Sequence, residues 1–249
     1  MSIANILDKC SNVMHAIANR VLPQDCHLCG APSVDALLCG SCDRSLQRIN
    51  PMHCPRCAMP ITTAGLCGQC LKTPPHFDAT LAALRYAFPA DQLILGLKYG
   101  ARLPLAVLLG DLLGKRLSLR SATPDLMIPM PLHRARLSER GFNQALEISR
   151  RLVRISGVPV RTEGILRVRD TARQADLHAT QRLANVRGAF DCDVNLSGMT
   201  VAIVDDVMTT GASLNELARV LKRAGATRVE NWVVARTWPG SGGKAQEHV

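Results

Sequence analysis

Alternating apolar and polar blocks over the last two thirds of the chain predict an α/β domain. Apolar runs predict strands at 79–88, 125–130, 200–205 and 228–236, and short strands near 158–168. Apolar residues at helical spacing predict helices near 91–98, 103–118, 143–156 and 213–224, and a helical turn at 180–187. This alternation is typical of a mainly parallel sheet with flanking helices.

The chain before residue 76 follows a different pattern. Apolar residues at helical spacing predict an amphipathic helix over 1–23, and the paired prolines Pro74 and Pro75 mark a linker. We therefore expect a small module at 24–73, the α/β domain at 76–238 and a disordered tail at 239–249.

Neither a membrane span nor an export signal is expected. The chain holds no uncharged apolar run of 18 residues, which argues against membrane insertion. Asp8 and Lys9 interrupt the first apolar stretch, and no small-residue cleavage site follows it. These features predict a cytoplasmic protein.

Cysteine spacing gives the sharpest chemical signal. Eight of the ten cysteines form two C-x2-C-x9-C-x2-C units, the second shifted by 28 residues from the first. The predicted metal ligands are Cys26, Cys29, Cys39, Cys42, Cys54, Cys57, Cys67 and Cys70. Each unit supplies four thiolates, which is a closed tetrahedral zinc set. The spacing therefore predicts a double zinc ribbon with two structural Zn2+ ions.

Two alternatives to this assignment concern the ligands themselves. Pairing within each unit is the simpler arrangement, but ligands crossed between the units satisfy the same spacing. His27 and His53 adjoin ligand cysteines and could replace one of them. A disulfide-bonded module is disfavoured in a reducing compartment.

Positive charge is concentrated in one part of the chain. The net charge is +10, and residues 131–187 alone hold twelve arginines and five acidic residues, a net charge of +7. A field of this sign attracts phosphate groups, on a small molecule or on a nucleic acid. Aromatic residues make up 3% of the chain, which predicts an aliphatic core and few platforms for base stacking.

The segment VAIVDDVMTTGAS, residues 201–213, combines the chemistry of a ribose–phosphate site. A buried strand is expected to end in Asp205 and Asp206, whose carboxylates accept hydrogen bonds from neighbouring hydroxyls. A glycine turn and a helix N-terminus follow, which favour a phosphate. The simpler alternative for Ser213 is a capping box with Glu216.

This segment resembles the phosphoribosyl diphosphate motif of type I phosphoribosyltransferases. The family pattern has an apolar strand, two acids, an apolar pair and T-T-G-x-[ST], and every signature position is met. The resemblance implies that Asp205 and Asp206 are catalytic and contact the ribose hydroxyls. It implies a 5-phosphate site formed by Thr209, Thr210, Gly211, Ala212 and Ser213.

Most of the chain, from about residue 20 to 237, resembles the ComF family of competence-related phosphoribosyltransferase-like proteins. The resemblance rests on the double zinc ribbon and on the segments LGLKYGARLP, IPMPLHRARLSERGFNQA and LRVRDTARQADLHATQRLANVRGAF. It implies a type I phosphoribosyltransferase-like domain with a flexible hood loop over 167–187.

The resemblance also assigns the basic residues. The loop after strand 125–130 would bind pyrophosphate through Arg134, Arg136 and Arg140, and Asn143 would cap the next helix. Lys98 would lie near the diphosphate. An exposed basic loop without such a role is the alternative.

Two functions from different classes follow. The first is binding of phosphoribosyl diphosphate with Mg2+ and transfer of ribose 5-phosphate to an acceptor. The second, implied by the ComF resemblance, is binding of single-stranded DNA alongside other DNA-uptake proteins, with little or no transferase activity. Its candidate contacts are Arg167, Arg169, Arg173, Arg182 and Arg187.

Overall fold

The computed structural model of the chain describes residues 24–33, 36–120, 122–170 and 186–238. The helix expected over 1–23, most of the turn expected at 180–187 and the tail 239–249 lie outside these ranges. The chain divides into two compact units, Met1–Leu46 and Gln47–Val249. The first cysteine unit therefore belongs to one compact unit and the second to the other.

The described part of the first unit is small. Strand β1 (Gln24–Asp25) pairs antiparallel with β2 (Pro32–Ser33), and a short helix, α2 (Gly40–Ser45), follows. The hairpin and the beginning of α2 place Cys26, Cys29, Cys39 and Cys42 around one point.

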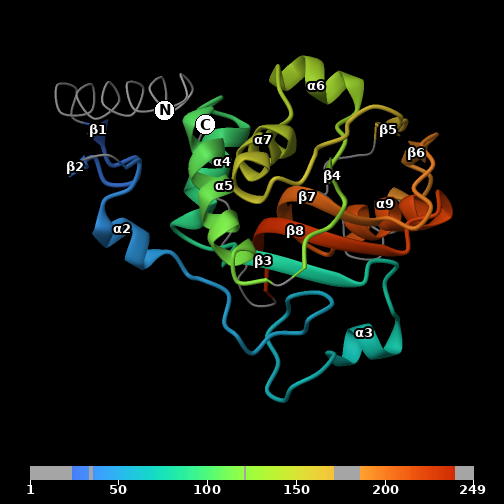
Figure 1. The fold of residues 1–249 in the computed structure, drawn as a ribbon. Helices are drawn as coiled ribbons and strands as arrows, with labels where there is room; N and C mark the ends of the chain where they lie inside the picture. Colours follow the sequence, from blue (N-terminus) through green and yellow to red (C-terminus); the bar gives the residue numbers. More distant parts are fainter. Residues whose placement is uncertain (1–23, 34–35, 121, 171–185, 239–249) are drawn as a thin grey trace, which may run out of the picture. The chain divides into compact units, whose positions relative to one another are not determined.

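The second unit is built on a four-stranded parallel sheet, as the sequence predicts (Figure 1). Its order is β3 (Ala79–Arg85), β8 (Arg228–Arg236), β7 (Thr200–Met208) and β4 (Leu126–Pro129). In the central register, Ile203 of β7 lies beside Ile128 of β4 and Asn231 of β8. The carboxyl ends of these strands lie at one edge of the sheet, where ligands bind in open α/β folds.

Helices cover the sheet. Helices α4 (Ala90–Lys98), α5 (Pro104–Leu117) and α7 (Gln144–Ser156) lie together on one side of the sheet in Figure 1. Helix α9 (Ala212–Arg223) packs in one core with Val201 and Ile203. The largest fully buried side chains are aliphatic apart from Trp232, in agreement with the scarcity of aromatic residues.

Two glycines let α5 approach α7 closely. A Cβ atom on Gly110 would lie 2.7 Å from Cβ of Arg151, and one on Gly114 would lie 2.6 Å from Cδ1 of Ile155. Side chains at these positions would push the helices apart. The glycines of this apolar helix therefore serve packing.

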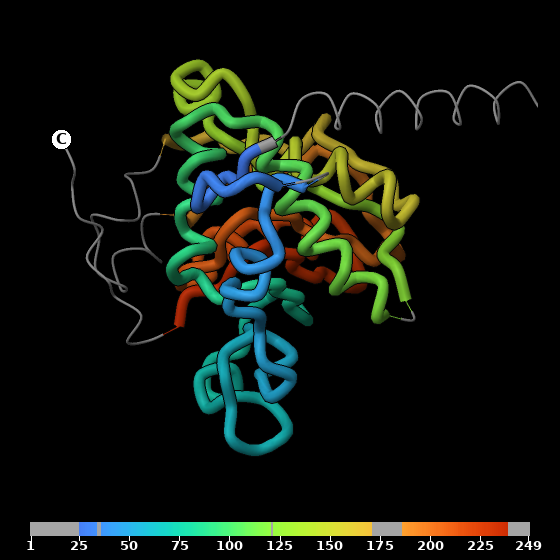
Figure 2. The backbone as a smooth tube through the Cα atoms, turned by 90° about the vertical axis from the view of Figure 1, so that its left-hand side faces the viewer, coloured from blue at the N-terminus to red at the C-terminus, as the bar shows by residue number. Residues whose placement is uncertain are grey.

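The segment that carries the second cysteine unit lies on the other side of the sheet from α4, α5 and α7. Residues 51–67 and helix α3 (Gly68–Lys72) occupy this position in both views (Figures 1 and 2). Cys54, Cys57 and Cys70 are buried in the same core as Ile203 and Val233.

Three short elements complete the second unit. Helix α6 (Arg134–Arg140) follows β4, and strand β5 (Ile165–Arg167) pairs antiparallel with β6 (Phe190–Cys192). Within the described ranges, no helix combines the length and the apolar character that a membrane crossing requires.

Candidate functional site

The turn between β7 and α9 has the backbone expected of a phosphate loop. Strand β7 continues through both acids to Met208, three residues beyond the predicted end. Gly211 then adopts φ +81°, and α9 begins at Ala212. The first N–H groups of the helix and the positive end of its dipole lie at this turn.

The capping-box alternative for Ser213 is wrong. Helix α9 has Gly211 as its N-cap and no side-chain cap hydrogen bond. The Glu216 carboxylate instead accepts hydrogen bonds from the backbone N–H of Gly188, at 2.8 Å, and from the Arg219 guanidinium. These partners lower the pKa of Glu216, the Arg219 hydrogen bonds making the largest contribution.

The two adjacent carboxylates have different surroundings. Asp206 is buried, with a side chain 4% exposed, and its Oδ2 lies 2.6 Å from Nζ of Lys98. Lys98 is the last residue of α4, so this ion pair joins two sequence-predicted site residues from distant parts of the chain. Arg167 of β5 interacts electrostatically with Asp205.

The positive charge of Lys98 compensates only part of the negative charge of Asp205 and Asp206. Burial and the neighbouring Asp206 raise the pKa of Asp205 well above its ordinary value, and Lys98 offsets only part of this effect. Burial lowers the pKa of Lys98, but the Asp206 carboxylate outweighs it, and the net shift is upward. Lys98 therefore stays charged, and the site favours a further cation or hydroxyl donors beside Asp205.

The basic segment after β4 is a helix, whereas the sequence suggested a loop. Nδ1 of His133 accepts a hydrogen bond from the N–H of Ala135 at 3.4 Å, and Gly141 ends the helix at φ +80°. Together these two caps stabilise a helix of only seven residues. Asn143 caps the next helix, α7, as predicted, because its Oδ1 accepts from two N–H groups in the first turn.

The three arginines of α6 have different neighbours. The guanidinium of Arg136 lies 3.3 Å from the carboxylate of Asp170. Arg140 lies over the ring of Tyr99, 5.6 Å from its centre, and donates to Gln144. Arg134 lines an open cavity of about 600 Å³.

This cavity is a feature that the sequence did not reveal. It lies between the end of β4, α6, the beginning of α7 and β5, and its lining mixes basic and apolar side chains. The predicted site residues Arg134 and Arg167 line it together with Leu132, Phe142 and Ile165. Its walls come from two stretches of the chain, residues 128–150 and 162–168, which meet only in the folded unit, so no local pattern marks it.

The described ends of the predicted hood are held by their own contacts. Arg167 lies over the ring of Phe190, 5.5 Å from its centre. Nη1 of Arg169 donates to the backbone oxygen of Arg187 at 2.6 Å. The candidate DNA contacts Arg173 and Arg182 lie outside the described residues.

The cysteines form two separate tetrads, each from one unit of the repeat. In each tetrad the four sulfur atoms lie within 4.8 Å of one another. The Sγ atoms of Cys29 and Cys39 are 3.8 Å apart, and those of Cys57 and Cys67 are 3.5 Å apart. Tetrahedral Zn–S bonds of about 2.3 Å place sulfur atoms about 3.8 Å apart, so both tetrads fit zinc.

This arrangement resolves the alternatives that the spacing left open. The ligands pair within each unit, and every described cysteine is free of disulfide bonds. His53 belongs to neither tetrad, and its Nδ1 lies 2.6 Å from the backbone oxygen of Asn50. Burial raises the pKa of Cys54, but backbone N–H donors, first that of Cys67, outweigh it and lower the value to about 7.

Comparison with known proteins agrees with both parts of the chain. Residues 17–71 match the double zinc ribbon domain, and residues 138–247 match the phosphoribosyl transferase domain. The fold and the cysteine tetrads thus define a protein that combines a double zinc ribbon with a type I phosphoribosyltransferase-like domain.

Relatives then identify the family. The DNA utilization protein YhgH of Salmonella typhi is 34% identical over 223 residues, which cover 87% of this chain and 98% of the relative. Competence protein F of Haemophilus influenzae is 33% identical over 176 residues, covering 67% and 76%. The chain belongs to the ComF family. A purine phosphoribosyltransferase from Pyrococcus horikoshii aligns over 52% of this chain and 77% of its own, with 18% identity and a TM-score of 0.30.

Proposed function

We propose that the chain binds phosphoribosyl diphosphate at the β7–α9 turn and transfers ribose 5-phosphate to an acceptor nucleophile. In this reaction the bond between ribose C1 and the diphosphate oxygen breaks, and the electron pair leaves with pyrophosphate. The acceptor supplies the pair for the new bond to C1. The observation that carries the proposal is the pair Asp205 and Asp206 at the end of a parallel strand, followed directly by the Gly211 turn and a helix N-terminus.

Each part of this site has a chemical task. The backbone and hydroxyl groups of residues 209–213 hold the 5-phosphate, and the carboxylates accept hydrogen bonds from the ribose hydroxyls. As the ribose becomes oxocarbenium-like, the carboxylates stabilise its positive charge. The ion pair with Lys98 holds the Asp206 carboxylate in place.

The donors present also fit Mg2+. Carboxylate oxygens are its preferred protein ligands, and the raised pKa of Asp205 indicates that a cation is favoured beside it. When bound with the ligand, Mg2+ would neutralise part of the diphosphate charge. The protein's own groups for that charge are Arg134, Arg136 and Arg140, whose forked guanidinium groups suit phosphate oxygens.

The open cavity beside α6 is the proposed place of the acceptor. It lies at the carboxyl end of β4, which pairs in parallel with β7, the strand that carries Asp205. An acceptor here would be close to the ribose. Its mixed lining favours a flat, partly apolar group with hydrogen-bonding edges.

A second candidate function is binding of single-stranded DNA during DNA uptake. It is supported by the net charge of +7 over residues 131–187 and by relatives named for competence and DNA utilization. The arginines at 167, 169, 173, 182 and 187 would contact the phosphate backbone. Both functions would operate in the cytoplasm, where cysteine thiolates stay reduced.

Calorimetry separates the two candidates. Titration with phosphoribosyl diphosphate and Mg2+ should give saturable binding with one site per chain, and a short single-stranded DNA should then be tested as competitor. Binding of the small molecule alone supports the transferase. Binding of DNA alone, weakening steeply as salt rises, would support the second candidate and sink the first.

A further inference from the structure

One buried arginine connects the second cysteine tetrad to the β7–α9 turn. Arg236, the last residue of β8, is 6% exposed. Its Nε donates to the backbone oxygen of Cys57 at 2.9 Å. Its Nη1 donates to the backbone oxygen of Met208 at 3.0 Å and also contacts that of Thr209. A single side chain therefore spans from a cysteine of the tetrad to the first residues of the turn.

The knuckle of the tetrad, residues 54–57, is hydrogen-bonded to the sheet at two further points. The backbone N–H of Thr80 donates to the oxygen of Pro55 at 3.0 Å, and the Thr80 hydroxyl donates to the oxygen of Arg56 at 2.7 Å. Counting the bond to Cys57, three consecutive carbonyl groups of the knuckle are held by β3 and β8. The knuckle is thus a structural part of the α/β unit.

Apolar packing also connects the second tetrad to the β7–α9 turn. The knuckle cysteines share one buried core with Phe77 and Met208. A Cβ atom built on Gly211 would lie 2.6 Å from Cε of Met208 and 3.9 Å from Cε1 of Phe77. The proposed phosphate turn therefore rests on side chains that also pack with the tetrad.

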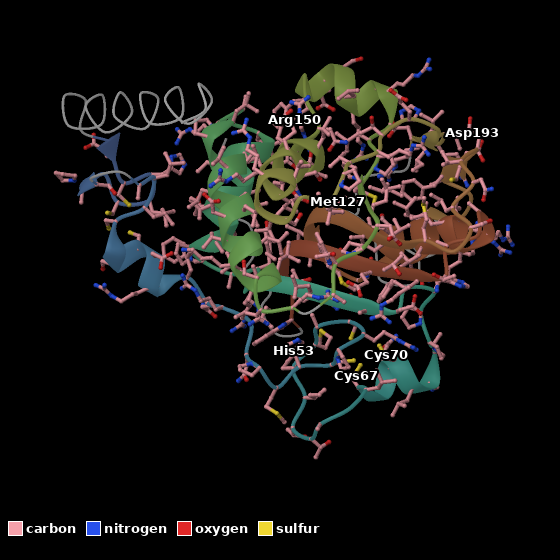
Figure 3. All side chains as sticks on the ribbon, in the orientation of Figure 1. His53, Cys67, Cys70, Met127, Arg150 and Asp193 are labelled. Atoms are coloured by element: carbon pink, nitrogen blue, oxygen red, sulfur yellow. The ribbon has the colours of Figure 1, made fainter. Side chains whose placement is uncertain are left out.

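Charge adds to this connection. Four thiolates around one Zn2+ carry a net charge of −2. The buried Arg236 guanidinium donates to the backbone oxygen of Cys57, one of the four ligand residues, so a loaded tetrad would place a counter-charge close to this cation. Figure 3 shows Cys67, the N-cap of α3, close to Cys70, which lies within this helix.

We propose that Arg236 is a positioning residue through which the metal-loaded second tetrad fixes the backbone of the β7–α9 turn. Loss of the second tetrad then loosens this turn, whereas loss of the first tetrad, which belongs to the other compact unit, does not. The expected weakening of phosphoribosyl diphosphate binding rests on the proposed function. The expected loosening of the turn's backbone does not.

The test compares hydrogen exchange and ligand binding in full-length variants. Cys67→Ser disrupts the second tetrad, Cys39→Ser disrupts the first, and Arg236→Met removes the connecting guanidinium while leaving both tetrads intact. Arg120→Met is the matched control, because Arg120 forms an ion pair with Glu230 of the same strand, β8. Metal analysis of each variant counts the zinc that remains.

In Cys67→Ser and Arg236→Met, amides of residues 208–213 should exchange at least tenfold faster, and phosphoribosyl diphosphate should bind about tenfold more weakly, roughly 1.4 kcal/mol. Arg236→Met should retain the wild-type zinc content, and Arg236→Lys should be intermediate, since an ammonium lacks the fork that reaches both carbonyl groups. Cys39→Ser and Arg120→Met should exchange like wild type at the turn.

Wild-type exchange at the turn in Arg236→Met or Cys67→Ser would overturn the proposal, and so would equal acceleration in Cys39→Ser. Amides of α5 and α7 serve as the internal reference. If hydrogen exchange at the α5 and α7 amides accelerates as much as at the turn, the variant has lost its fold. The milder variant Arg236→Lys then tests whether the guanidinium holds the turn. If wild type binds no phosphoribosyl diphosphate, the proposed function fails, while the exchange result still tests the connection.

Discussion

Replacing the two adjacent acids by asparagine should change stability in opposite directions. Asp205→Asn removes a carboxylate whose pKa is raised by burial and by Asp206. A carboxyl group with a raised folded-state pKa destabilises the fold once the pH exceeds its unfolded value, so at pH 7 the amide should be more stable than the acid. We therefore expect a higher free energy of unfolding at pH 7, and each 1 kcal/mol of gain would raise Tm by about 2–4 °C for a unit of this size.

Asp206→Asn removes the partner of Lys98, 2.6 Å away. At an effective dielectric of about 20, unit charges about 3 Å apart attract by roughly 5 kcal/mol. The Lys98 side chain is 21% exposed, so water recovers part of this loss when Asp206 is neutralised. The net cost should be about 1–3 kcal/mol, below the range for a fully buried pair.

Urea unfolding and thermal melting at pH 7 measure both effects, and Asp205→Asn and Asp206→Asn serve as controls for each other because the chemical change is the same. Both variants should bind phosphoribosyl diphosphate ten- to a hundredfold more weakly, since each loses a charge-assisted hydrogen bond worth about 1.5–3 kcal/mol. Stability changes of the same sign in the two variants would refute the electrostatic reasoning.

Three further outcomes are expected. Metal analysis of purified chain should find close to two zinc ions, and oxidised cysteine pairs without zinc would contradict the ribbons. Gly211→Val should weaken phosphoribosyl diphosphate binding more than either Asn variant, because φ +81° disfavours a β-branched residue and its Cβ would meet Met208; unchanged affinity would contradict the close approach of this backbone. Replacing Arg167, Arg169 and Arg173 by Ala should weaken single-stranded DNA binding and flatten its salt dependence. An unchanged slope of affinity against salt concentration would show that these side chains do not contact the DNA backbone.

Hydrophobic periodicity predicted the helices and strands whose pattern of apolar residues can be recognised from their own sequence alone. Strand β8 was predicted with its observed bounds, 228–236, because Val229 and the apolar run 232–235 mark a buried strand despite the polar residues between them. The eight ligand cysteines followed from their spacing, whereas their grouping into one tetrad per unit was established by the structure. Helix α6 was missed because seven residues give too little periodicity, and its stability depends on the caps His133 and Gly141.

The other features of the site depend on tertiary contacts, which the sequence pattern does not show. Lys98 was placed near the site only by family resemblance, and its pairing with Asp206 depends on how α4 packs against the sheet. Nothing in the sequence singled out Arg236, because the last residue of a buried strand is not expected to be a buried cation. Its partners, Cys57 and Met208, lie 179 and 28 residues away along the chain.

The most direct test of the ribose–phosphate site is a phosphorus NMR titration of phosphoribosyl diphosphate and Mg2+ with the chain, because the 5-phosphate and the diphosphate give separate resonances. We predict that the 5-phosphate resonance shifts or broadens with wild type, and far less with Gly211→Val at equal concentration. If wild-type chain in excess leaves the 5-phosphate resonance unchanged, the turn at residues 209–213 does not bind it, and the proposed function is wrong.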